Sequence, residues 1–82
     1  MDKKKMLRRI LNSQKNVKFN DMVVLLEAFG FGLSRSEGSH NIFKNPKVAE
    51  IINLQNVNGE AKPYQIRQFL ALIEKHNLKM ED

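Results

Sequence analysis

The chain has 82 residues, no cysteine and a formal net charge of +5. This length supports one domain, and the lack of cysteine excludes a disulfide framework and a thiolate zinc site. No apolar run reaches the roughly 18 residues of a membrane helix, and the basic start lacks the apolar core and cleavage site of a signal peptide, so we predict a cytoplasmic protein without membrane association.

The positive charge is concentrated at the start of the chain. Residues 1–19 carry seven basic side chains against Asp2 alone, whereas the rest of the chain is nearly neutral. We therefore divide the chain into a basic N-terminal helical arm, 1–18, and a domain, 19–82. Such an arm raises the affinity for a polyanion without reading its sequence, although a solvated, solubilising tail is the more frequent meaning of this pattern.

Two helices are predicted before residue 31. Residues 3–13 carry apolar side chains at helical spacing, which indicates a short amphipathic helix. The second helix is expected to begin at Asn20, a good N-cap, and to end before Gly30, which suits the left-handed position after a helix. The expected apolar stripe of the first helix comprises Leu7, Ile10 and Leu11.

After Gly30 the apolar period changes to short runs bounded by turn residues. Residues 31–37, 40–45 and 50–54 each indicate a strand, and together they favour a three-stranded antiparallel meander. Asn58-Gly59 marks a turn in the loop that follows, and Pro63 begins a last amphipathic helix. The predicted fold is an α+β sandwich, and its last five elements, α-β-β-β-α, have the topology of the double-stranded RNA-binding domain.

His40 is the main candidate for chemistry, because a positioned histidine can transfer protons near neutral pH. By strand alternation it shares a face with Ile42 and Lys44, whereas Phe43 points the other way. If Phe43 is the core residue, His40 and Lys44 share the open face, which suits cleavage of a phosphodiester by its ribose 2′-hydroxyl. If Ile42 is the core residue, His40 points inward, and alternation alone leaves both readings open.

A structural role is the more frequent meaning of a single strand histidine. The other histidine, His76, lies near the end of the last helix, where the helix dipole favours a cationic ring, so we expect a structural role there. The carboxylates are scattered without a paired spacing, and the chain has no His-Glu-x-x-His motif and no Walker-type loop. We therefore predict neither a metal nor a small-molecule cofactor.

The residues from the second helix onward resemble a known family. A helix ending in Leu-x-x-x-Gly-Phe, then Gly38-Ser39-His40 before an apolar-aromatic pair, and then a closing amphipathic helix are similar to the HicA toxins of bacterial HicAB toxin-antitoxin systems. The resemblance covers about residues 19–78, so the N-terminal helix is an addition. It implies the double-stranded RNA-binding-domain fold, metal-independent cleavage of mRNA, and a HicB-like antitoxin that masks the active site.

The catalytic histidine of the family falls on His40 by position, so the resemblance implies that His40 is the catalytic residue. Two features depart from the family pattern: Asn41 stands where many relatives have a second histidine, and Ile52-Asn53-Leu54-Gln55 replaces a strand that usually contains proline and histidine. The residues expected to contact RNA are Gly38, Ser39, Lys44, Arg35, Lys62 and Arg67.

Two other readings stay open at this point. The chain can be a non-catalytic RNA-binding or protein-interaction domain that keeps the fold without the chemistry. Alternatively, Tyr64, Arg67 and the open sheet face can serve chiefly to bind the antitoxin. Incubation of the purified protein with a long RNA separates the first reading from a nuclease, because a binding domain leaves the RNA intact.

Overall fold

Helix α1 (Lys3–Asn12) precedes helix α2 (Phe19–Ala28) in the computed structural model, which describes residues 2–81. Met1 and Asp82, the outer ends of the predicted arm and domain, lie outside the described residues. Four strands and a last helix follow in chain order: β1 (Gly32–Glu37), β2 (His40–Asn45), β3 (Val48–Val57), β4 (Glu60–Ala61) and α3 (Pro63–His76).

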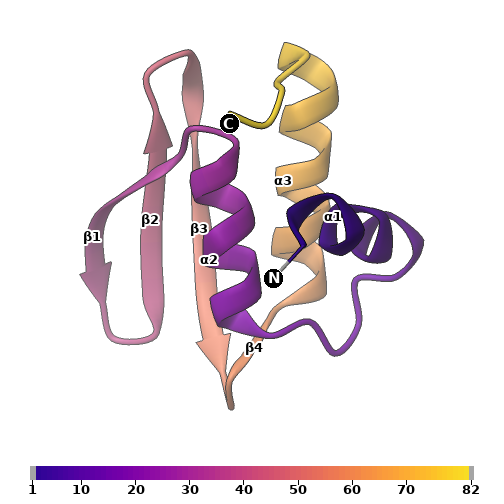
Figure 1. Ribbon diagram of the computed structural model, residues 1–82. Helices are drawn as coiled ribbons and strands as arrows, with labels where there is room; N and C mark the ends of the chain where they lie inside the picture. Colours follow the sequence, from indigo (N-terminus) through magenta and orange to yellow (C-terminus); the bar gives the residue numbers. More distant parts are fainter. Residues whose placement is uncertain (1, 82) are drawn as a thin grey trace.

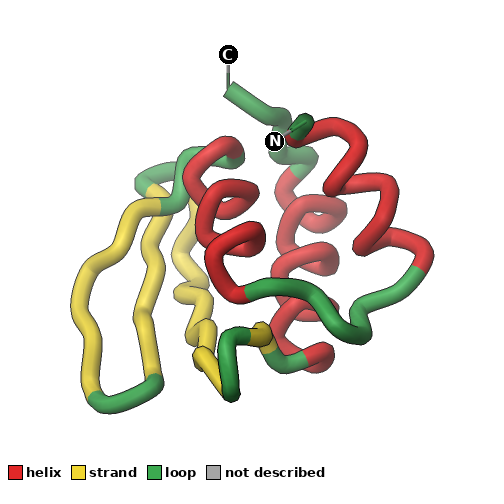
Figure 2. The backbone as a smooth tube through the Cα atoms, turned by 60° about the horizontal axis from the view of Figure 1, so that its bottom comes forward, coloured by secondary structure: helices red, strands yellow, loops and turns green. Residues whose placement is uncertain are grey.

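The strands form one antiparallel sheet in the order β1-β2-β3-β4. Helices α2 and α3 lie on one side of it and contact β3, and α2 also contacts β4 (Figures 1 and 2). Strand β1 projects beyond the helices, and all six of its residues are exposed. The predicted α+β class, the N-terminal helix and the antiparallel meander are confirmed.

The prediction of three strands is wrong, because β4 pairs with the end of β3. Asn58 and Gly59 form the two-residue turn between them, with φ angles of 52° and 85°. Two consecutive positive φ values are typical of a type I′ hairpin turn. The sequence marked this turn correctly but not the strand after it, because two residues are too few to show an alternating pattern.

Helix α1 docks on the rest of the protein. Its Asp2 N-cap accepts a hydrogen bond from the Lys5 backbone N–H (3.2 Å), and this bond lowers the pKa of the Asp2 carboxyl. Met6 and Ile10 are buried in the common core, whereas Leu11, predicted on the buried face, is 59 % exposed. The cap and the docked apolar face together offset the unfavourable position of lysines near the positive end of a helix.

Helix α2 begins earlier than predicted. Its N-cap is Lys18 rather than Asn20, and no side chain caps it. The reason is backbone pairing with the segment around β4: the Phe19 N–H donates to the Gly59 carbonyl (2.9 Å), and the Ala61 N–H donates to the Val17 carbonyl (2.9 Å). The first of these bonds satisfies one of the N–H groups at the start of α2 that have no partner within the helix.

The end of α2 is as predicted. Gly30 has a φ of 90°. Its N–H donates to the Glu27 carbonyl (3.0 Å), and the Phe31 N–H donates to the Leu26 carbonyl (3.0 Å). This pair of hydrogen bonds is the Schellman motif, which requires a left-handed residue at the glycine position.

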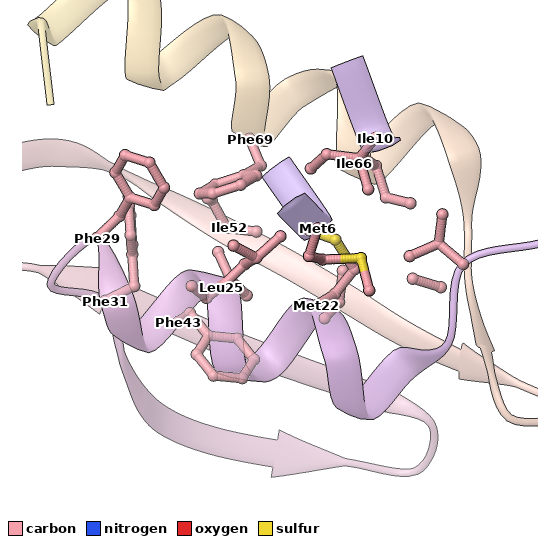
Figure 3. Packing of buried hydrophobic residues seen from close by; sticks show 14 of the residues in the cluster. Met6, Ile10, Met22, Leu25, Phe29, Phe31, Phe43, Ile52, Ile66 and Phe69 are labelled. Atoms are coloured by element: carbon pink, nitrogen blue, oxygen red, sulfur yellow. The ribbon is translucent and has the colours of Figure 1, made fainter. Parts of the chain in front are cut away.

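The core lies between the helices and the helix-facing side of the sheet (Figure 3). Phe69 of α3 is fully buried, and its ring meets the rings of Phe29 and Phe31 edge-on at centroid distances of 5.6 and 6.2 Å. From the sheet side, Phe43 and Ile52, which are register partners on β2 and β3, are also buried. Ile66 of α3 is also fully buried, so the last helix has the amphipathic character that was predicted for it.

Helix α3 is joined to β3 by charged side chains. The Lys75 ammonium donates to Glu50 Oε2 (2.7 Å), and His76 Nε2 lies 3.0 Å from Glu50 Oε1. The hydrogen bond from Lys75, with a smaller contribution from His76, lowers the pKa of Glu50 from 4.5 to about 2. His76 thus has the structural role that its position in the helix indicated.

This ion pair predicts a specific acid sensitivity. Because the folded-state pKa of Glu50 is depressed, its stabilising contribution is complete above pH 4.5 and is lost as the pH falls towards about 2. Urea unfolding should show the unchanged protein losing more free energy of unfolding over this range than Glu50→Gln. The control Glu74→Gln, on the exposed side of α3, should retain the full acid sensitivity, and an unaltered profile in Glu50→Gln would contradict the account.

Candidate functional site

A two-residue turn joins β1 to β2 and brings the glycine-serine-histidine motif to the end of the sheet. Gly38 and Ser39 form this turn between Glu37 and His40, which are Cα partners in the register. Gly38 has a φ of 59°, and a Cβ built on it would meet no atom within 4 Å. The glycine is therefore favoured by the backbone conformation and not by crowding.

The structure decides which residue of β2 faces the core. Phe43 is 2 % exposed, whereas His40 and Lys44 are exposed and Ile42 is half-buried. Because side chains alternate along a strand, His40, Ile42 and Lys44 share the face that points away from the helices. The alternative in which His40 points inward is excluded.

The register extends this face to the neighbouring strands. Between β1 and β2, Arg35 pairs with Ile42 and Glu37 pairs with His40. Between β2 and β3, Asn53 pairs with Ile42 and Gln55 pairs with His40. Residues paired across a sheet project from the same face. We call this surface the open face; it comprises Arg35, Glu37, His40, Ile42, Lys44, Asn53 and Gln55.

Asn53 holds the imidazole of His40. Its amide nitrogen Nδ2 lies 3.0 Å from His40 Nδ1, and its Oδ1 lies 3.2 Å from the same atom. The amide can donate to an unprotonated Nδ1 or accept from a protonated one, so it supports the ring in either state. The other ring nitrogen, Nε2, remains on an exposed side chain for contact with a ligand.

The residues expected to bind RNA fall into three groups. Gly38, Ser39, Arg35 and Lys44 lie in or beside the open face and its turn. Lys62 lies at the start of α3, with its ammonium 5.9 Å from the centroid of the Tyr64 ring. Arg67 is exposed on α3, in the helix layer, so the structure does not gather it with the residues of the open face.

The basic arm also lies apart from His40. Helix α1 contacts α2 and lies on the far side of the helix layer from β1 and β2 (Figures 1 and 2). If the arm and Lys44 both hold phosphates of one RNA, that RNA must therefore pass around the helices. Arg35 and Lys44 are the cations among the residues of the open face.

Sequence reasoning missed Glu37 and Asn53 as members of the site. Glu37 was one of several scattered carboxylates, and Asn53 appeared only as a departure from the family pattern. The signal for Glu37 was present, because a two-residue turn at Gly38-Ser39 makes Glu37 and His40 partners. Asn53 could not be placed without the register of β2 and β3.

Residues 2–81 contain neither a membrane-spanning helix nor a cluster of metal ligands. No helix in this part of the chain has both the length and the apolar character needed to cross a membrane. Within the same residues, no group of three or more histidine, aspartate or glutamate side chains is arranged to hold a metal ion.

Comparison with known proteins adds one match. The family model described as "HicA toxin of bacterial toxin-antitoxin" matches residues 19–75, which is well over half of the chain and includes α2, all four strands and nearly all of α3. Neither the curated proteins nor the solved structures gave a match to the chain. The helix α1 lies outside the matched segment. The chain therefore belongs to the HicA toxin family of bacterial toxin-antitoxin systems.

Proposed function

We propose that this toxin acts as a metal-independent endoribonuclease on mRNA and that His40 transfers a proton during strand scission. The observation that supports this most directly is the composition of the open face. An exposed imidazole stands opposite a carboxylate, is held by an amide, and shares its surface with two cations. This combination supplies proton transfer and attraction for phosphate in one place.

The proposed reaction is attack of a ribose 2′-hydroxyl on the adjacent phosphorus. A bond forms between the 2′-oxygen and phosphorus, and the bond from phosphorus to the 5′-oxygen breaks, which leaves a 2′,3′-cyclic phosphate and a 5′-hydroxyl. The 2′-hydroxyl must lose a proton and the leaving 5′-oxygen must gain one. Two proton-transfer groups on opposite sides of one phosphodiester are therefore needed.

Glu37 and His40 fit these two roles. As Cα partners on adjacent strands they have Cβ atoms about 5 Å apart, so both side chains can reach the same phosphodiester. We assign the carboxylate of Glu37 as the base that takes the 2′-hydroxyl proton and the imidazolium of His40 as the acid that protonates the 5′-oxygen. Asn53 keeps the ring oriented, Arg35 stabilises the charge that develops on the phosphate, and Lys44, further along β2, attracts another phosphate of the same RNA.

The function is tested by incubating the purified protein with a long RNA in the presence of a chelator. We expect cleavage into fragments that carry 2′,3′-cyclic phosphate and 5′-hydroxyl ends. RNA whose 2′-hydroxyls are methylated should resist cleavage, because the nucleophile is blocked. RNA that is shifted on a gel but stays intact would instead support the non-catalytic RNA-binding reading.

The separate roles of the two proton-transfer groups can be tested with a modified RNA. Glu37→Gln should slow cleavage about 10²-fold, at the lower end of the range for loss of a general acid or base. Replacing the 5′-oxygen at the cleaved bond with sulfur gives a leaving group that needs no proton. This substrate should restore cleavage by His40→Ala but not by Glu37→Gln, and the reverse pattern would show that the two roles are wrongly assigned.

A HicB-like antitoxin is the proposed protein partner, and we expect it to cover the open face. Such binding would mask His40 and both neighbouring cations at once. Co-expression with the product of the adjacent gene should yield a stable complex in which His40 becomes protected from chemical modification. Failure to recover a complex would count against this partner.

A further inference from the structure

The start of α3 lies at the same end of the molecule as the turn between β1 and β2 and the end of β3 (Figure 1). Gln65, which is 1 % exposed, connects these parts. The Gln55 backbone N–H donates to Gln65 Oε1 (2.7 Å), and Gln65 Nε2 donates to Gln55 Oε1 (3.0 Å). Since Gln55 is the register partner of His40, the first turn of α3 is fixed to β3 at the position paired with His40.

Tyr64 is part of the same network. Gln65 Nε2 lies 3.2 Å from the Tyr64 hydroxyl, so the phenol is anchored at its oxygen. The residue is nonetheless 47 % exposed. The Lys62 ammonium lies over the ring, 5.9 Å from its centroid. The Tyr64 ring and the Lys62 ammonium are thus held near Gln55, the residue of β3 that is paired with His40.

We propose that Tyr64 is a stacking platform for an unpaired base of the bound RNA. Proteins that bind single strands combine aromatic side chains, on which bases stack, with cations that follow the backbone. Bases inside a duplex are already stacked on both sides and have no free face for an aromatic ring. A nucleotide beside the cleaved bond therefore stacks on Tyr64 while Lys62 contacts its phosphate.

This inference rests on the proposed function for the place of the cleaved bond, but its binding test does not require cleavage. The full chain carrying His40→Ala is used, so that RNA is not consumed. Tyr64→Ala and Tyr64→Phe are each added to that chain, and circular dichroism checks that both remain folded. The affinity of each protein is then measured for a single-stranded RNA and for the same sequence as a duplex.

Tyr64→Ala should weaken binding of the single strand about 5- to 150-fold, which is the range for loss of one stacked base. Tyr64→Phe keeps the ring and loses only the hydroxyl, so its affinity should stay close to that of the parent. Binding of the duplex should be unaffected by either change. The same result is expected whether or not the unchanged protein cleaves RNA.

Three results would overturn the inference. Equal loss of single-strand binding in Tyr64→Phe and Tyr64→Ala would show that the hydroxyl, through Gln65, is what matters. Unchanged binding in Tyr64→Ala would remove the stacking role altogether. A duplex bound as tightly as the single strand, with the same dependence on Tyr64, would contradict stacking of an unpaired base on this ring. Lack of cleavage by the unchanged protein would instead contradict the proposed function alone.

Discussion

Cells that express the His40→Ala variant are expected to grow normally, whereas expression of the unchanged chain should arrest growth. Loss of a general acid typically slows a reaction about 10²- to 10⁴-fold, which would bring RNA cleavage below the level needed for toxicity. His40 is exposed, and Phe43 on the other face of β2 carries the packing, so the substitution should leave the fold intact. Growth curves at matched protein levels measure the effect.

The second histidine provides a matched control for this experiment. His76 lies on α3 and contacts Glu50, in the helix layer and away from the open face. His76→Ala removes the same side chain from a structural position and should still arrest growth. Equal arrest by His40→Ala, with both proteins present in the same amount, would contradict the assignment of His40.

Phe69→Ala should have the largest effect on stability. Phe69 is 0 % exposed and meets both Phe29 and Phe31 edge-on, so its removal leaves a large cavity at the centre of the core. Truncation of a buried phenylalanine costs about 3–5 kcal/mol, against a typical total of about 5–15 kcal/mol for a folded domain. Urea unfolding should show a much lower midpoint or no cooperative transition.

The control for this prediction is an apolar truncation at the surface. Leu11 is exposed on α1, and substitutions at such sites usually change stability by no more than about 0.5 kcal/mol. Leu11→Ala should therefore unfold at nearly the same urea concentration as the unchanged protein. A Phe69→Ala protein as stable as Leu11→Ala would show that the aromatic cluster does not support the core as the structure indicates.

The helices and their ends were largely predictable because the signals are local. Ile66 and Phe69 recur at helical spacing and are both buried, and Pro63 begins α3 as expected. Gly30 ends α2 because only a few residues tolerate its backbone angles. Lys18 replaced the predicted cap because residues 17–19 bond to the backbone around β4, which no local pattern reveals.

The register of the sheet was the part that sequence could not supply. Asn45 pairs with Val48, and continuing that pairing without interruption would place Asn53 opposite His40. An irregularity after Phe43 inserts two further residues of β3, so Gln55 pairs with His40 instead. Such bulges shift every later pair and are set by the packing of the whole sheet. The link from His40 through Gln55 to α3 follows from this shift.

Only part of the candidate site was predicted from the sequence, namely the shared face of His40 and Lys44. Strand alternation placed His40 and Lys44 together once Phe43 was known to be buried, whereas Glu37 was missed although the short turn implied that it lies opposite His40. The location of the basic arm could not be predicted, because a count of charges along the sequence does not show on which side of the folded protein they lie. Its helix docks through Met6 and Ile10 on the side of the protein away from the open face.

The rate of cleavage of one defined single-stranded RNA tests the central claim most directly. The unchanged protein and His40→Ala are compared at equal concentration, in excess over the RNA and with a chelator present, and binding is measured on the same samples. The account predicts that both proteins bind the RNA and that only the unchanged protein cuts it at a measurable rate. Equal cleavage rates, or bound RNA that neither protein cuts, would contradict the claim that His40 is catalytic.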